Sequence, residues 1–108
     1  MSSQTFQDIL NLIEHYEIRI SDHGYDELDE DNLFIKDILA SVHNGIVLED
    51  YPNDPKGSSV LVLQSDDKGN PIHVVWGIAK NTTSPAVLVT AYRPDSKLWT
   101  DDFQRRKL

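Results

Sequence analysis

The sequence predicts one α+β domain over residues 1–108, with two to three helices packed on one face of a mostly antiparallel sheet of four to five strands. Helical periodicity is confined to two segments before residue 45. The later apolar runs alternate or are β-branched, and the short turns between them favour antiparallel neighbours. A chain of this length forms one core rather than two. Helices on one face of the sheet are typical of this order of elements.

Residues 4–16 are expected to form the first helix, with Ser3 or Thr5 as its cap. Four apolar residues recur there at helical spacing: Phe6, Ile9, Leu10 and Ile13. Residues 18–20 alternate, which predicts a short strand with one buried face. Residues 22–31 carry six acids and no base, and this run predicts a loose, exposed helical turn that Gly24 interrupts.

The second helix is expected to begin after a cap at Asp31 or Asn32 and to stop at Asn44-Gly45. Its apolar stripe consists of Ile35, Ile38, Leu39 and Val42. Turn-forming residues then separate four runs of strand-forming residues. These runs predict strands at residues 46–51, 60–63, 71–78 and 86–92.

Alternation assigns the residues of the last two strands to two faces. In the strand 71–78, His73 and Val75 lie opposite the larger apolar set Ile72, Val74, Trp76 and Ile78. In the strand 86–92, one face holds Val87, Val89 and Ala91, and the other holds Leu88, Thr90 and Tyr92. With the larger apolar set under the helices, His73, Thr90 and Tyr92 are expected together on the open face.

The net charge of −8 is unevenly distributed, because residues 1–54 contain 13 of the 18 acids and only 2 of the 10 basic residues. An acidic protein repels a phosphate backbone at long range, although a local basic site in the second half remains compatible with this charge. The absence of cysteine excludes disulfides and thiolate metal sites. No stretch is apolar enough to span a membrane and the N-terminus lacks signal-peptide features, so a cytoplasmic protein is expected.

Two histidines are candidates for chemistry. His23 follows the first predicted strand, where a working side chain is common, and an imidazole can act as acid or base near neutral pH. Both His23 and His73 can equally be structural, the first as a surface or capping residue and the second as a half-buried polar group. The acids near His23 lack EF-hand or zinc spacing, so neither a metal nor another cofactor is predicted.

The basic residues concentrate after the last strand, at Arg93, Lys97, Arg105, Arg106 and Lys107. Tyr92 and Trp99 lie among them. Guanidinium groups bind phosphates and aromatic rings stack on unpaired bases, which suggests contacts with a nucleic acid. The alternative is that Trp99 pins an otherwise exposed tail to the sheet.

The ordered set of these motifs resembles the bacterial domain of unknown function 4258. The resemblance rests on Ser21-Asp22-His23-Gly24, on Glu49-Asp50-Tyr51 after the second helix, and on Pro71-Ile72-His73-Val74-Val75. It continues through Val89-Thr90-Ala91-Tyr92-Arg93-Pro94-Asp95 to Trp99 and Arg105-Arg106-Lys107, and so covers residues 18–107.

That family is similar to the RelE-like toxin ribonucleases. The resemblance implies a RelE-like fold, RNA as substrate, an antitoxin-like protein as partner and a metal-independent reaction. It implies catalytic roles for His23, His73 and Tyr92. Substrate-binding roles would fall to Thr90, Arg93, Trp99, Arg105 and Arg106, with the arginines inferred from their charge.

The chain departs from the family at Glu27, a position that is commonly arginine. A carboxylate there is expected to repel RNA phosphate, which favours the alternative of a non-catalytic module whose acidic half binds a basic partner. The two functions stay open at this point, and the sequence carries no signal for an oligomeric state.

Overall fold

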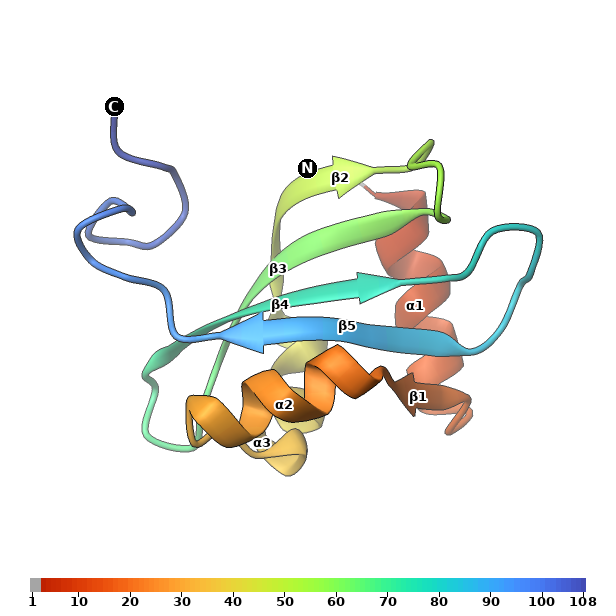
Figure 1. Ribbon diagram of the computed structural model, residues 1–108, viewed down its shortest axis with the longest axis horizontal. Coiled ribbons are helices and arrows are strands. Elements are labelled where there is room, and N and C mark those ends of the chain that lie inside the picture. The colour runs from red at the N-terminus through yellow and green to blue at the C-terminus, as the bar shows by residue number, and fades with distance from the viewer. Residues whose placement is uncertain (1–2) are drawn as a thin grey trace.

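The computed structural model describes residues 3–108 of the chain (Figure 1). The structure contains three α-helices, one short 3₁₀-helix and five strands, and all but the second α-helix and the 3₁₀-helix follow the predicted order. Their bounds are α1 Gln4–Glu14, β1 Ile18–Ile20, α2 Asp22–Glu30, α3 Ile35–Ser41, η1 Val42–Asn44, β2 Ile46–Tyr51, β3 Ser59–Ser65, β4 Pro71–Gly77 and β5 Ala86–Tyr92. The predicted α+β class is therefore confirmed.

The five strands form one mixed sheet in the order β1-β5-β4-β3-β2. The three pairings among β2, β3, β4 and β5 are antiparallel, as their short connections require. β1 pairs with β5 in parallel, with Ile18 opposite Ala86 and Ile20 opposite Leu88. The sheet is thus mostly but not wholly antiparallel, because the first strand is placed at the edge beside the last.

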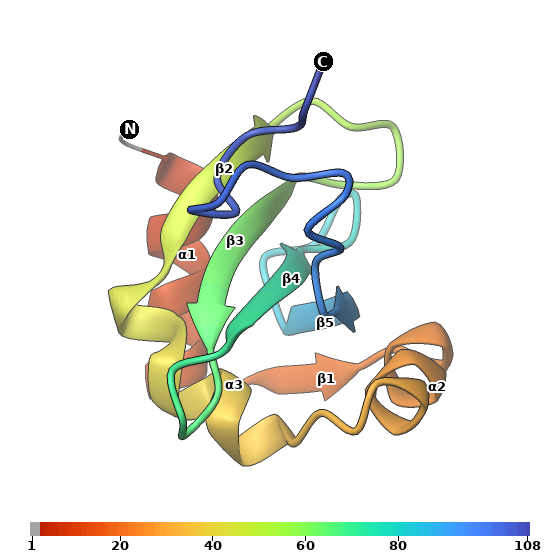
Figure 2. The same ribbon diagram turned by 90° about the vertical axis from the view of Figure 1, so that its left-hand side faces the viewer.

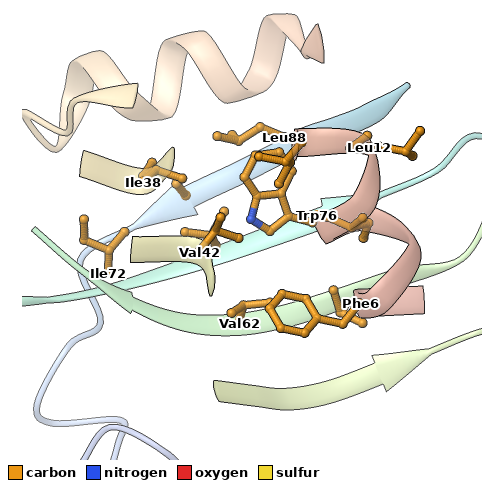
Figure 3. Packing of buried hydrophobic residues seen from close by; sticks show 14 of the residues in the cluster. Phe6, Leu12, Ile38, Val42, Val62, Ile72, Trp76 and Leu88 are labelled. Carbon is orange, nitrogen blue, oxygen red and sulfur yellow. The ribbon is translucent and has the colours of Figure 1, made fainter. Parts of the chain in front are cut away.

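The hydrophobic core lies between the sheet and the helices α1 and α3. In Figure 1, α1 lies behind the strands and α3 lies below them, next to α2. Trp76 is the largest fully buried side chain of this core, and Figure 3 shows the indole surrounded by apolar side chains from α1, α3 and the strands. The indole Nε1 donates to Gln64 Oε1 at 2.9 Å, and Gln64 Nε2 donates to the Ile38 carbonyl at 2.6 Å. Gln64 therefore satisfies the only polar atom of the central tryptophan side chain and ties α3 to β3.

The acidic run forms a regular helix, α2, rather than the loose turn predicted. Ser21 caps it, since its hydroxyl accepts from the Gly24 amide at 2.9 Å and donates to the Val89 carbonyl at 2.8 Å. Gly24 sits inside the helix where a Cβ would approach the Leu88 carbonyl oxygen to 2.8 Å. The glycine that was expected to interrupt the helix instead lets α2 pack closely against β5. Figure 2 shows that α2 follows directly after β1, the edge strand of the sheet.

The predicted cap of the next helix was wrong. Asp31 is the C-cap of α2, Asn32 adopts a positive φ of 53°, and α3 begins only at Ile35 after Phe34. The Asp31 carboxylate accepts instead from the Arg93 amide at 2.9 Å. It therefore joins the end of α2 to the end of β5.

A β-bulge in β5 corrects the predicted faces of that strand. Trp76 pairs with Leu88, whereas Val75 pairs with Thr90, so Val89 is the extra residue. The bulge puts Leu88 and Ala91 on the core face. Thr90 and Tyr92 remain on the open face with Val75 and His73, as expected.

After β5 the chain forms a small loop that we call the C-terminal hairpin, residues 98–107. An isolated antiparallel bridge joins Trp99 to Arg106, and the Lys107 amide donates to the Leu98 carbonyl at 2.8 Å. Trp99 is 3% exposed, so it anchors the hairpin on the open face of the sheet. No helix within residues 3–108 is both long and apolar enough to cross a membrane.

Candidate site on the open face

His73 is the centre of the polar cluster on the open face, and the C-terminal hairpin covers it completely. Its ring is 0% exposed and meets the Trp99 indole edge-on, with 4.4 Å between ring centroids. Nε2 lies 2.8 Å from the Phe103 carbonyl, and Nδ1 lies 3.3 Å from the Tyr92 hydroxyl. Because a carbonyl can only accept, Nε2 carries the proton and the Tyr92 hydroxyl donates to Nδ1 of the neutral ring.

Trp99 also contacts a member of an ion pair. The Arg106 guanidinium stacks over the indole at 4.7 Å from its centroid, and its Nε lies 3.4 Å from Glu49 Oε2. The Tyr51 hydroxyl donates to the other Glu49 oxygen at 2.7 Å. The cluster therefore contains an imidazole, a carboxylate, a guanidinium and two phenols on one face of the sheet.

The environment shifts the pKa values of this cluster in directions that fix its charges near neutral pH. Burial lowers the pKa of His73, and the nearby Arg106 charge adds to this, although the Phe103 hydrogen bond and Glu49 act the other way. Burial raises the pKa of Tyr92. The hydrogen bond from Tyr51 is the main cause that lowers the pKa of Glu49. His73 and Tyr92 are therefore neutral while Glu49 is an anion.

His23 lies apart from His73, at the exposed start of α2. Its Nε2 is 3.5 Å from Glu27 Oε1, and its side chain is 65% exposed. The Ser21 hydroxyl, two residues earlier, contacts Val89, whereas His73 pairs with Tyr92, three residues further along β5. Three residues of a strand span about 10 Å, so the start of α2 and His73 lie beside positions of β5 that are about this far apart.

Helical geometry still turns His23 toward the same side of the sheet. Successive residues of an α-helix are about 100° apart around its axis. Gly24 faces β5 and Leu28 is displaced from it toward the core. Glu27 and His23 are displaced in the opposite sense, so they lie on the flank of α2 that borders the open face.

The predicted substrate-binding residues are only partly gathered. Thr90 is half-buried beside Val75, and Trp99 and Arg106 belong to the His73 cluster. Arg93 is held elsewhere, because its Nη1 lies 2.9 Å from Asp66 Oδ2 in the turn between β3 and β4. Arg105 is exposed at the tip of the C-terminal hairpin, where its amide donates to Thr100 Oγ1 at 3.3 Å.

Asp66 is the centre of that turn rather than a member of the cluster. Its partial burial would raise the pKa of the carboxyl group, but hydrogen bonds from Asn70, Lys68 and Arg93 lower the pKa to about 2. Asp66 is thus an anion near neutral pH, and its ion pair with Arg93 holds that guanidinium at the turn.

Three members of the cluster were not predicted as site residues from the sequence: Glu49, Tyr51 and Phe103. Glu49 and Tyr51 are two residues apart in β2, and a period-two analysis of that strand would have placed them on one face. Phe103 contributes its carbonyl and has φ 58°, and no sequence pattern marks such a contact. Within residues 3–108 no three His, Asp or Glu side chains are grouped so as to hold a metal ion.

The fold and this cluster define a small α+β domain with a group of ionisable side chains on the open face of its sheet. The chain belongs to the family described as Domain of unknown function (DUF4258), whose model matches residues 20–93. The matched region contains His23, His73, Thr90 and Tyr92, and the C-terminal hairpin lies beyond it. Neither the curated proteins nor the solved structures contain a significant match to the chain.

Proposed function

We propose that this domain is a metal-independent endoribonuclease of the RelE-like toxin type, with its reaction centre at the His73 cluster. The observation that carries the proposal is the gathering of His73, Tyr92, Glu49 and Arg106 around Trp99 on the open face. RNA cleavage without a metal needs a base, an acid and a cation at one phosphate. The cluster contains a group suited to each role.

The charges of the cluster suit these roles at neutral pH. Once Phe103 has withdrawn, the neutral His73 ring can take its other tautomer, in which the proton is on Nδ1 and is donated to the Tyr92 hydroxyl. Nε2 then accepts the proton of the ribose 2′-hydroxyl, and the 2′-oxygen attacks phosphorus. The bond to the 5′-oxygen breaks, and that oxygen takes the proton of the Tyr92 hydroxyl, which the raised pKa keeps in place. Arg106 stabilises the charge on the phosphorane, and Glu49 orients the guanidinium.

The burial of His73 sets a condition on this chemistry. Phe103 occupies the position next to Nε2 of the imidazole, so RNA reaches His73 only after the loop of residues 100–105, which carries Phe103, has opened. Most hydrogen bonds of the hairpin are internal, among them Thr100 to Arg105 and Phe103 to Thr100, both at 2.8 Å. These bonds lie within residues 100–105, so this loop can open while the bridge between Trp99 and Arg106 keeps Arg106 beside Glu49.

The test is cleavage of a fluorescent single-stranded RNA by the purified full chain at low salt and in the presence of a metal chelator. We expect His73→Gln, Tyr92→Phe and Arg106→Gln to lower the rate at least about tenfold each, while His15→Gln leaves it unchanged. His15 is the matched control because it is exposed and bonded only to the Asn11 carbonyl of its own helix. Thermal unfolding confirms that each variant is folded. Intact RNA with the wild-type chain contradicts the proposal.

A second function is favoured by the position of Glu27. Its carboxylate lies on the flank of α2 that borders the open face, and the exposed Asp26 and Asp29 extend the acidic surface around the helix. On this alternative the domain is a non-catalytic module that binds a basic partner through α2. Reversal of these three charges should then abolish a partner complex that wild-type chain forms at low salt, and a complex unaffected by the reversal argues against the module.

A further inference from the structure

A shallow groove on the open face has two cationic side chains and an apolar floor. It has a volume of about 260 Å³, and its floor is formed by Gly77, Val87 and Val89. Arg19 and Lys56 are the charged residues of its lining, and no carboxylate belongs to it. We call it the open-face groove.

Strand register puts the groove on the same face as the His73 cluster. Arg19 pairs with Val87 and lies between Ile18 and Ile20, which pack on the core, so its side chain is on the open side. Gly77 lies four residues from His73 in β4 and therefore shares its face. The groove is about 13 Å from His73 along the strand, and the C-terminal hairpin does not line it.

The loop that carries Lys56 has a fixed backbone. Gly57 adopts φ +124°, and a Cβ on it would lie 2.1 Å from the Ile78 carbonyl oxygen. The Lys56 carbonyl also accepts from the Lys80 amide at 3.1 Å, which ties this loop to the segment after β4. The nearby Asp54 carboxylate accepts from the Lys56 amide at 2.9 Å and so turns back on its own loop.

Neither cation of the groove is neutralised by the chain. Among residues 3–108 the ion pairs involve His23, His43, Arg93 and Arg106 only. Arg19 is exposed and is one of 2 basic residues among the first 54 of a chain with net charge −8. Two unpaired cations that line one groove of so acidic a protein mark a local site for an anionic group.

We propose that the open-face groove binds a backbone phosphate of single-stranded RNA through Arg19 and Lys56. This inference rests on the proposed function, because the strand whose reacting phosphate lies at His73 would continue along β5 and past Thr90 to the groove. The aliphatic floor accommodates ribose, and the absence of an aromatic ring from the lining argues against a stacked base there. The groove therefore holds the strand in place without reading its sequence.

The test is fluorescence anisotropy of a labelled, uncleavable 2′-O-methyl RNA oligonucleotide with the full chain between about 50 and 200 mM salt. Each phosphate contact with single-stranded RNA contributes about 0.7 to the slope of log affinity against log salt. We expect Arg19→Gln and Lys56→Gln each to weaken binding, and the double variant to reduce that slope by about 0.7. Lys36→Gln should change neither quantity, since Lys36 is an equally exposed cation on α3, across the core from the groove.

The outcomes separate this inference from the proposed function. Binding that depends on Arg19 and Lys56 without RNA cleavage supports the groove and contradicts the endoribonuclease. If the chain cleaves RNA but Arg19→Gln and Lys56→Gln bind it with the same affinity and salt dependence as Lys36→Gln, the groove proposal is wrong and the endoribonuclease proposal is retained. Absence of binding at the lowest salt overturns the groove, as does preferential binding of a labelled acidic peptide in the same assay.

Discussion

His73 donates a hydrogen bond through Nε2 to the backbone carbonyl of Phe103 at 2.8 Å, across thirty residues of sequence. The contact fixes the tautomer of the imidazole and closes the C-terminal hairpin over it. A histidine buried in this way is neutral and positioned, but it is also inaccessible. The same hydrogen bond therefore links the stability of the hairpin to the exposure of the candidate site.

Trp99→Ala is expected to release the C-terminal hairpin. The indole is 3% exposed and contacts both His73 and Arg106, so its loss should lower the free energy of unfolding by about 3 kcal/mol. Diethyl pyrocarbonate should then modify His73 much faster than in the wild-type chain, as read by peptide mass spectrometry. Leu98→Ala is the control, because Leu98 is 62% exposed. Equal modification rates for all three proteins would show that Trp99 does not hold the hairpin closed.

The lowered pKa of His73 predicts a loss of stability in mild acid. Above its ordinary value of 6.5 the imidazole is neutral in both the folded and the unfolded chain, so it contributes no pH dependence. Below 6.5 the unfolded chain binds a proton that the folded chain does not, and the free energy of unfolding falls until the pH reaches the lower folded pKa. Urea unfolding across this range should show a weaker fall for His73→Gln than for wild type. His15→Gln should retain the wild-type slope, and a slope unchanged in His73→Gln would contradict the assignment.

Gln64→Leu should destabilise the core without changing its size greatly. The substitution leaves the Trp76 Nε1 group without an acceptor in a buried site, whereas the Ile38 carbonyl still accepts from the Ser41 hydroxyl at 3.4 Å. An unsatisfied buried polar group costs about 1–3 kcal/mol, which urea unfolding measures directly. Gln104→Leu, at an exposed position of the C-terminal hairpin, should cost much less. Similar losses for the two variants would mean that the glutamine contacts add little.

Gly57→Ala and Gly69→Ala form a matched pair for the loop that carries Lys56. Both glycines have positive φ, at 124° and 82°, so both substitutions introduce backbone strain. Only at Gly57 would the new Cβ collide with backbone, at 2.1 Å from Ile78, since nothing lies within 4 Å of a Cβ at Gly69. We expect the Gly57 variant to lose at least about 2 kcal/mol more than the Gly69 variant in thermal or urea unfolding. Equal losses would show that the loop relaxes around a methyl group.

Much of the fold could be predicted from periodicity, because the apolar residues of α1 recur at helical spacing and those of the strands alternate or form short β-branched runs. The predicted strand 86–92 coincides with β5, and Ser3 is the cap of α1. The bulge at Val89 could not be predicted, since it results from the joint register of β4 and β5 and leaves no mark in either strand alone. The helix through the acidic run was missed because its stability comes from the Ser21 cap and from packing of Gly24 and Leu28 on β5.

The candidate site was predicted in outline only. His73, Thr90 and Tyr92 share the open face because alternation places them there, and the bulge preserves this. The cover over His73 depends on a contact between a side chain and a backbone carbonyl, which sequence patterns do not encode. The separation of His23 from His73 also depends on where α2 sits against β5, and this is tertiary packing rather than local preference.

The parallel pairing of β1 with β5 has a consequence for the order in which the chain can fold. Ser21 and Val89, which meet at that edge, are 68 residues apart, and β1 has no other strand neighbour. During synthesis the first helix, β1 and α2 therefore emerge long before the strand that receives them. Contacts this distant in sequence slow folding, because a long loop must close before they form. The domain is expected to stay unassembled at its N-terminal edge until its last strand has been made.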